Sequence, residues 1–284
     1  MDYIRRTKPT GELSRKLERL EEILPESHLR IEEDLKKIRG VIFEIAPYYD
    51  VIQNLFGIYL LTGGIPMVVN RYLESGKIDP SLSEVFMRSV LGDLSKLSRG
   101  MERTHVTTID YLQLMEESFI LLIHYAYDFG RREVKFKGDK KIYFLDPFIL
   151  HSVRSYLSGR DVWDVISGTL QDESALGSLV EGVVISHLLT HGEIPYLRRG
   201  LTFLWSYYDK SRREIDAVIK VNGGRYRGIE VKYQAQVNKR DVRKVPQIRD
   251  YIILSRGDMG GDEGLLIVPA SLLLALLPKS EGNL

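Results

Sequence analysis

The sequence has no cysteine among its 284 residues. This absence excludes disulfide scaffolds, thiol nucleophiles, zinc ribbons and iron–sulfur clusters, so any metal ion must be held by carboxylates, imidazoles or carbonyl groups. It also fits a reducing compartment, and we expect a cytoplasmic protein. The longest apolar run, LLIVPASLLLALLP from Leu265 to Pro278, is too short to span a bilayer, and the amino end lacks the apolar segment of a signal peptide. No membrane partner is therefore expected.

Several catalytic motifs are also missing. No GxxxxGK[ST] phosphate loop occurs, so we expect neither ATP binding nor ATP hydrolysis. Neither a GxSxG elbow nor an HExxH zinc motif occurs, and no GxGxxG follows an expected strand. His187 and His191 have a spacing that can chelate zinc, but Gly192 and Pro195 indicate a helix end, which favours ordinary core or surface histidines.

The formal net charge of +1 hides an uneven distribution. Residues 1–195 sum to −5, and residues 257–284 sum to −3. Residues 196–256 hold 15 Lys and Arg against 6 Asp and Glu, a sum of +9. Such a block is typical of a protein that binds phosphate backbones, so DNA is the expected partner, although a solvated basic face explains it equally well. The basic candidate DNA-contacting residues are Arg212, Arg213, Lys239, Arg240, Arg243 and Lys244.

Hydrophobic spacing predicts a mainly helical amino-terminal part. Helices are expected over 10–24, 27–45, 49–61 and 67–73. A further helix over 107–116 precedes an apolar stretch and a hairpin that turns at Gly138-Asp139, which is the order of the back half of a winged helix. This helix carries acids and no Lys or Arg, which favours a protein–protein spacer over a DNA reader.

The carboxyl-terminal part mixes helix and strand signals. A helix over 175–189 precedes strands over 201–208, 215–221 and 228–233, and Asn222-Gly223-Gly224 indicates a hairpin between the last two. A helix over 238–251, interrupted by Pro246, places Gln247 and Tyr251 on one face, and a strand follows over 264–268. The expected order is thus helix, three antiparallel strands, helix and strand.

Candidate catalytic residues lie on the second and third of these strands. Glu230 and Lys232 share one face of their strand because side chains alternate, and Asp216 can lie beside Glu230. Two carboxylates beside a lysine suit phosphodiester hydrolysis: the acids hold Mg²⁺ or Mn²⁺, the metal activates water, and the lysine orients that water. Glu181, on the preceding helix, can complete the metal shell or can be an exposed residue of an amphipathic helix, and the sequence favours neither role. An inter-strand salt bridge on a solvated sheet face is the alternative.

These four residues carry a family resemblance. Glu181, Asp216, Glu230 and Lys232 resemble the E…D…(D/E)xK signature of the PD-(D/E)XK nuclease superfamily, whose core has the element order expected above. This resemblance implies a nuclease-like fold with a magnesium site. Some nucleases of the superfamily carry a Gln-x-x-x-Tyr that contacts DNA, so the resemblance also makes Gln247 and Tyr251 candidate DNA contacts, with a generic basic helix as the alternative.

Three longer strings resemble a second family. YLLTGGIPMVVNRYLESG from Tyr59, YFLDPFI from Tyr143 and EIDAVI…GIEVKY from Glu214 resemble, in that order, the region after the nucleotide-binding core of archaeal AAA+ ATPases. In that family the core is followed by a helical lid, a winged helix and a nuclease-like domain. The phosphate loop is absent here, and RGMERTHV from Arg99 is shorter than the corresponding stretch of the family, so an incomplete winged helix is expected.

The resemblance implies an α+β multidomain protein. We expect a helical lid-like domain over 1–98, a truncated winged-helix-like module over 99–158 and an α/β, restriction-endonuclease-like PD-(D/E)XK domain over 159–284. Two functions fit this organisation. One is DNA binding with magnesium-dependent hydrolysis, and the other is an inactive nuclease-fold module that pairs with a full-length AAA+ ATPase or with itself.

Overall fold

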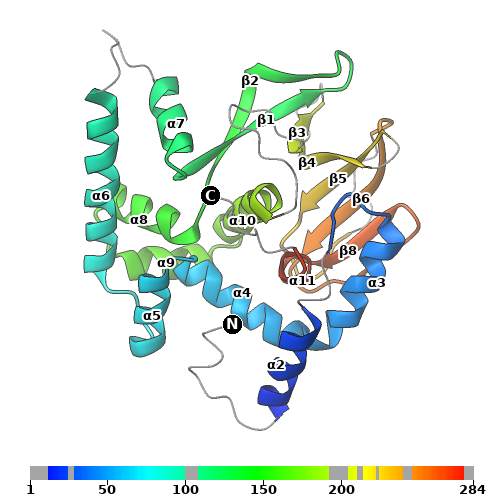
Figure 1. Ribbon diagram of the computed structural model, residues 1–284, viewed down its shortest axis with the longest axis horizontal. Helices are drawn as coiled ribbons and strands as arrows, with labels where there is room; N and C mark the ends of the chain where they lie inside the picture. The colour runs from blue at the N-terminus through cyan, green and yellow to red at the C-terminus, as the bar shows by residue number, and fades with distance from the viewer. Residues whose placement is uncertain are drawn as a thin grey trace. The chain divides into compact units, whose positions relative to one another are not determined.

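The computed structural model describes residues 12–24, 29–99, 108–191, 204–209, 214–221, 224–238 and 245–277 (Figure 1). The chain divides into two compact units. The first unit is Met1–Phe56, His124–Lys141 and Val184–Leu284, and the second is Gly57–Ile123 and Ile142–Val183. Each unit therefore collects stretches that are distant in sequence. The division of the chain into lid, winged-helix and nuclease-like domains stays a prediction.

Six of the seven expected helical ranges hold a helix among the described residues, and four further helices, at Pro80–Arg99, Pro147–Ser158, Val162–Gln171 and Ala270–Ala275, were not predicted individually. The helices are α2 (Glu12–Ile23), α3 (Leu35–Ile45), α4 (Tyr49–Thr62), α5 (Pro66–Ser75), α6 (Pro80–Arg99), α7 (Thr108–Glu117), α8 (Pro147–Ser158), α9 (Val162–Gln171), α10 (Glu173–His191) and α11 (Ala270–Ala275), with a 3₁₀ turn at Ala46–Tyr48. Among the described residues, no single helix is long and apolar enough to cross a membrane. One bent pair of helical segments, Leu35–Thr62 with Pro66–Ser75, has the length and composition of a membrane span, which is weak evidence for one.

The strands form one mixed sheet. They are β1 (Leu121–Asp128), β2 (Glu133–Phe144), β3 (Leu204–Tyr208), β4 (Glu214–Val221), β5 (Arg225–Val231), β6 (Ile248–Ser255), β7 (Gly260–Gly261) and β8 (Leu265–Pro269). Their order in the sheet is β2-β1-β3-β4-β5-β6-β8-β7. Strands β3, β4 and β5 are antiparallel neighbours, whereas β5, β6 and β8 run parallel. The expected sequence of one helix and three antiparallel strands is thus present as α10, β3, β4 and β5.

A buried apolar core holds the sheet of the first unit together. Ile215 and Val218 of β4 pack with Ile253 of β6 and Ile267 of β8. Helices α3 and α11 pack against β8 and against each other (Figure 1). Strand β6 is buried along nearly its whole length, as expected for a strand with parallel partners on both sides.

The register between β5 and β6 depends on a glycine. Gly228 pairs with Tyr251, and a Cβ atom at position 228 would lie 2.7 Å from Cδ1 of the tyrosine ring. Only glycine leaves this space open, so the ring of Tyr251 can pack against β5 at this position. Its hydroxyl accepts a hydrogen bond from the backbone N–H of Val245 at 2.7 Å.

A buried ion pair connects the sheet to the segment before α3. Arg227 of β5 donates to Asp250 of β6 through Nε at 2.5 Å and through Nη2 at 3.1 Å. Its Nη1 atom donates to the carbonyl oxygens of Ile31 at 2.6 Å and Glu33 at 2.9 Å. The guanidinium is 1% exposed, so these four acceptors replace the water that the charge loses on burial.

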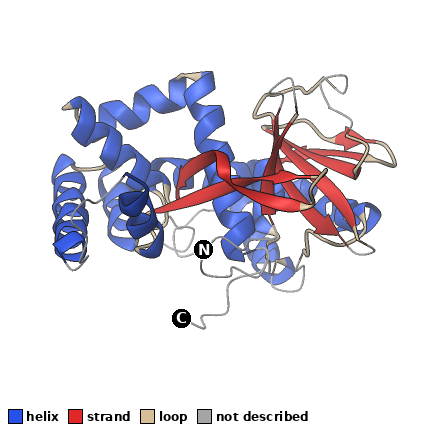
Figure 2. Ribbon diagram, turned by 90° about the horizontal axis from the view of Figure 1, so that it is seen from above, coloured by secondary structure: helices blue, strands red, loops and turns tan. Residues whose placement is uncertain are grey.

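The second unit is almost entirely helical (Figure 2). Side-chain caps and glycines set its helix ends. Asp146 accepts a hydrogen bond from the N–H of Phe148 at the start of α8, and Asp161 accepts one from Trp163 at the start of α9. Gly76 ends α5 at a φ of 70°, a left-handed conformation that glycine adopts without strain. Val68, Ile78, Phe148, Val162 and Ile166 form the core.

Three element predictions are wrong in part. The second helix begins at Leu35, where Asp34 caps it, and not at residue 27, because the backbone of 29–33 is engaged by other parts of the first unit. The hairpin does not turn at Gly138-Asp139, since β2 runs through both residues. The chain reverses instead at 129–132, where Asp128 accepts hydrogen bonds from the N–H groups of Gly130 and Arg131.

The helix predicted over 238–251 is also wrong at its carboxyl end. Residues 239–244 lie outside the described residues, and Ile248–Ser255 form β6. Pro246 does not continue a helix, and the β-branched run that follows it is buried in the parallel part of the sheet. Gln247 and Tyr251 are therefore not neighbours on a helix face.

We expect Asp250→Ala to lower the free energy of unfolding by about 3–5 kcal/mol, because it leaves the buried Arg227 guanidinium without its counter-charge. Urea unfolding followed by circular dichroism measures this loss. Arg249→Ala is the control, since its side chain is 48% exposed and its ion pair with Asp250 spans 4.0 Å, so it should cost less than about 1 kcal/mol. Equal losses in the two variants would contradict the assignment of Arg227–Asp250 as the stabilising pair.

Acid should destabilise the second unit through His151. Its Nε2 atom lies 2.9 Å from the carbonyl oxygen of Leu60, and burial lowers its pKa from 6.5 to about 4. As pH falls from 6.5 to 4, the unfolded chain therefore takes up a proton that the folded chain does not, and stability falls by about 2 kcal/mol between pH 7.5 and 5. His151→Gln keeps a donor for Leu60 and should reduce this loss in urea titrations at the two pH values. An unchanged loss would rule out His151 as its source.

Candidate functional site

Strands β4 and β5 bring the predicted carboxylates together. Ala217 pairs with Ile229 across the two strands, so Asp216 lies next to Glu230. The Asp216 side chain is 13% exposed and that of Glu230 is 4% exposed, while the flanking Ile215 and Ala217 are fully buried. Two acids thus lie at one end of a strand pair that also supplies Ile215, Val218 and Ile229 to the buried interior.

Three contacts fix Asp216. Its Oδ2 atom accepts a hydrogen bond from the N–H of Val231 at 2.8 Å, so the carboxylate is directed across to β5. Its Oδ1 atom lies 3.3 Å from Nζ of Lys141. Its backbone carbonyl oxygen lies 3.0 Å from Nε2 of His124, whose pKa burial lowers to about 4, so the imidazole is neutral and donates here. The carboxylate orientation is therefore determined by the sheet and not by solvent.

Lys141 is a site residue that sequence reasoning missed. It lies on β2, and its ammonium group forms ion pairs with both Glu214 and Asp216 of β4. The side chain is 20% exposed. No local signal marks it, because it precedes Asp216 by 75 residues in the chain. Glu214 had a signal, since it lies two positions before Asp216 on the same strand and so shares its face.

Lys232 follows the end of β5 and lies beside Glu230. The distance from its Nζ to Oε2 of Glu230 is 3.7 Å, and its side chain is 44% exposed. Its backbone N–H donates to the carbonyl oxygen of Leu254 at 2.9 Å, which extends the pairing with β6 by one residue. The ammonium group is therefore anchored at its backbone and accessible at its tip.

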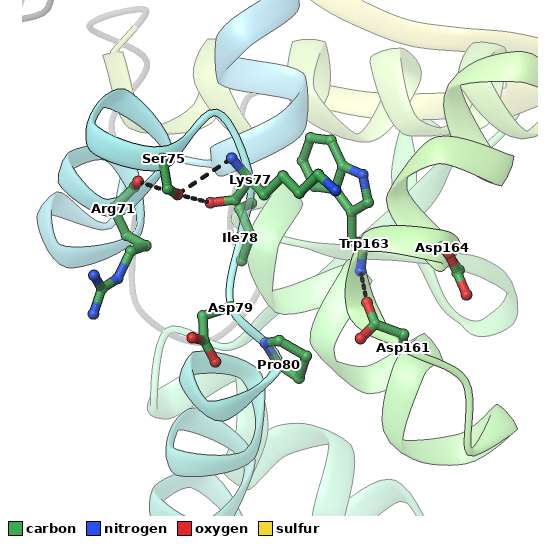
Figure 3. Close-up of a pocket in the computed structure, with 9 residues that line it drawn as sticks. All are labelled: Arg71, Ser75, Lys77, Ile78, Asp79, Pro80, Asp161, Trp163 and Asp164. Carbon is green, nitrogen blue, oxygen red and sulfur yellow. Dashed lines mark hydrogen bonds between the residues drawn. The ribbon is translucent and has the colours of Figure 1, made fainter.

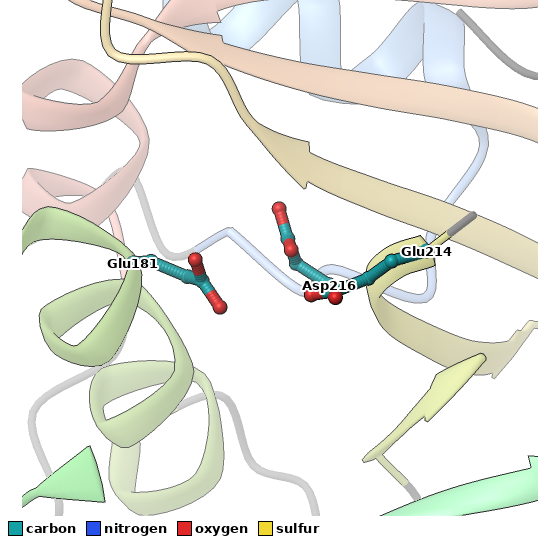
Figure 4. A group of neighbouring side chains, drawn as sticks. All are labelled: Glu181, Glu214 and Asp216. Atoms are coloured by element: carbon teal, nitrogen blue, oxygen red, sulfur yellow. The ribbon is translucent and has the colours of Figure 1, made fainter. Parts of the chain in front are cut away.

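Glu181 comes from α10 and accepts a 2.5 Å hydrogen bond from the hydroxyl of Tyr143. Figure 4 draws Glu214 and Asp216 of β4, two carboxylates of the first unit that can offer oxygen ligands to one metal ion. Glutamate and aspartate oxygens are the ligands that Mg²⁺ and Mn²⁺ prefer. The two acids of β4 have one oxygen each within 4.8 Å of the other, a separation that a bridging cation can span.

The predicted DNA-contacting residues are mostly not described. Arg212, Arg213, Lys239, Arg240, Arg243 and Lys244 lie outside the described residues. Gln247 is exposed in the turn before β6. Tyr251 is 5% exposed and packs into the core of the sheet, so its predicted role as a DNA contact is wrong.

A cavity of about 570 Å³ lies apart from these residues, within the second unit (Figure 3). It lies between α5 and the start of α9, and Arg71, Lys77, Asp79 and Trp163 are among its lining residues. Asp161 also lines it, but its Oδ1 atom already accepts a hydrogen bond from the N–H of Trp163 at 2.7 Å. None of the predicted catalytic residues lines this cavity.

Residues 176–262 match the family model of a domain of unknown function, DUF4143. This domain is found in carboxyl-terminal regions associated with AAA ATPases. The match begins within α10, ends just after β7 and includes Glu181, Asp216, Glu230 and Lys232. Searches of curated proteins and of solved structures gave no match.

Proposed function

We propose that this chain binds DNA and hydrolyses phosphodiester bonds with a divalent metal ion held at the end of β4 and β5. The observation that carries the proposal is the cluster of Glu214, Asp216 and Glu230 on the adjacent strands β4 and β5, with the ammonium groups of Lys141 and Lys232 beside them. In this proposal the carboxyl-terminal region is a PD-(D/E)XK nuclease-like domain. The helical region corresponds to an AAA+ lid, and α7 with the strands after it to a truncated winged helix.

Each residue has a separate task in this mechanism. Asp216 and Glu230 would hold Mg²⁺ or Mn²⁺, Glu214 offers a further oxygen beside Asp216, and Glu181 stays the additional ligand expected from the sequence. When bound, such an ion would supply Lewis-acid polarisation of the phosphate and activation of water. The hydrogen bond from Val231 holds the Asp216 carboxylate in one orientation, which lowers the cost of arranging the ligands. The ammonium of Lys232, exposed at its tip, orients the attacking water and stabilises the charge that develops on the phosphate.

DNA binding is proposed for the basic block over 196–256. Its sum of +9 attracts a polyanion, and this attraction needs no base-specific contact. Glu214, Asp216 and Glu230 belong to the same stretch of sequence, whose net positive charge offsets at long range the repulsion between carboxylates and phosphate groups. Because the sequence has no phosphate loop, we propose that the chain does not bind or hydrolyse ATP.

A second candidate function is a non-catalytic module that pairs with a full-length AAA+ ATPase or with itself. One observation favours it: the ammonium of Lys141 already lies against Glu214 and Asp216, and that of Lys232 lies 3.7 Å from Glu230. These ion pairs balance most of the negative charge without a metal ion.

Asp216→Asn and Lys232→Met test the catalytic proposal. Cleavage of linear, supercoiled and branched DNA in Mg²⁺ or Mn²⁺ should fall by about 100-fold or more in both variants, because each removes a charge that acts on the metal or on the developing phosphate charge. Glu263→Gln and Lys36→Met are the controls, since both side chains are exposed on the same unit and lie outside the basic block. Absence of cleavage by the parent chain on all substrates, or full activity in the variants, would favour the non-catalytic module.

Salt dependence tests the DNA proposal independently of cleavage. Fluorescence anisotropy with labelled duplex in EDTA should show a dissociation constant that rises steeply with salt. Arg243→Gln with Lys244→Gln should reduce the slope of log Kd against log salt by about 1–2, as expected for the loss of one or two phosphate contacts. Arg71→Gln with Lys77→Gln, in the second unit, should leave the slope unchanged. Equal slopes for all three proteins would place the contacts outside 243–244.

A further inference from the structure

The ammonium group of Lys141 occupies the space between the two acids of β4. It forms ion pairs with Glu214 and with Asp216, the latter at 3.3 Å. The three side chains are 20%, 31% and 13% exposed, so water screens them only in part. One carboxylate oxygen of Glu214 lies within 4.8 Å of one from Asp216, a distance at which two negative charges repel unless a cation lies near both.

We propose that Lys141 competes with the divalent metal ion for Glu214 and Asp216. In the metal-free protein its ammonium neutralises the two carboxylates, and it must leave them when Mg²⁺ or Mn²⁺ binds. This inference rests on the proposed metal site and adds a residue that regulates its occupancy. Lys141 lies on β2, a strand that holds none of the expected catalytic residues.

Two physical properties make this exchange possible. A lysine ammonium is a compact point charge on a flexible four-carbon chain, so it can bind two carboxylates in one rotamer and move away in another. A divalent ion needs the same oxygens at about 2.0–2.2 Å, and its charge repels an ammonium a few ångströms away. Both cations cannot therefore occupy the space between Glu214 and Asp216, and the ion pair lowers the affinity for metal.

Lys232 does not compete with the metal ion in this way. Its Nζ atom is 3.7 Å from Glu230, and its side chain is 44% exposed against 20% for Lys141. Lys232 thus lies at the edge of the cluster, where an ammonium can remain while metal is bound. The two lysines have different roles because β2 directs one to the acids of β4 and β5 holds the other beside Glu230.

Binding of Mn²⁺ to the full chain, followed by the electron paramagnetic resonance signal of free Mn²⁺, tests the proposal without any activity assay. Lys141→Met should bind Mn²⁺ about tenfold more tightly than the parent, as expected when a competing ion pair worth about 1.4 kcal/mol is removed. In EDTA the same variant should have a lower melting temperature, because Glu214 and Asp216 then repel, and Mn²⁺ should restore it. Lys137→Met, an exposed position on the same strand, should match the parent in both measurements.

The outcomes separate this inference from the proposed function. If the parent binds Mn²⁺, Asp216→Asn abolishes that binding and Lys141→Met binds no more tightly than the parent, then the competition is refuted while the metal site stands. If neither the parent nor Lys141→Met binds Mn²⁺, both proposals fail and Lys141 is a permanent structural ion pair. Binding by Lys141→Met alone would support competition. Lys141→Gln, which keeps a polar group near the acids, replaces Lys141→Met should that variant not fold.

Discussion

The register between β4 and β5 is the constraint on which the candidate site depends. Ala217 lies opposite Ile229, and a shift of one residue would turn Asp216 to the face of the sheet opposite Glu230. The pairing of β5 with its other neighbour, β6, is constrained as well, because Gly228 leaves the space that the ring of Tyr251 fills. The acidic cluster is therefore determined by core packing several residues away from it.

The same constraint extends to the amino-terminal part of the first unit. Arg227 bonds to Asp250 on the next strand and to the carbonyl oxygens of Ile31 and Glu33. The N–H of Leu29 donates to the carbonyl of Leu276, which follows the last helix. These bonds use backbone groups that a helix would need for itself, which explains why α3 starts at Leu35. A segment read from sequence as lid-like thus contributes to the core beneath the sheet.

Local sequence patterns predicted the elements with strong short-range signals. The helix α10 and the strands β3, β4, β5 and β8 lie close to their expected ranges, because periodicity and turn residues determine them. Strand β6 was misread because an apolar run buried on both faces has no alternation that distinguishes it from a helix. Lys141 could not be found at all. Its position depends on β1 pairing with β3 in parallel, and such long-range pairing leaves no local trace in the sequence.

The two candidate functions differ in what balances the charge of the cluster. In the structure, the ammonium group of Lys141 forms ion pairs with Glu214 and Asp216, and that of Lys232 forms one with Glu230. A non-catalytic module needs nothing more, since the ion pairs satisfy the acids and stabilise this end of β4 and β5. Hydrolysis needs a divalent ion at the same oxygens. Binding of that ion to the carboxylates must release more free energy than is lost when the ammonium group of Lys141 leaves them. Because the acids are fixed by strand register while the lysine is flexible, this competition is decided by the metal's coordination requirements and not by any rearrangement of the fold.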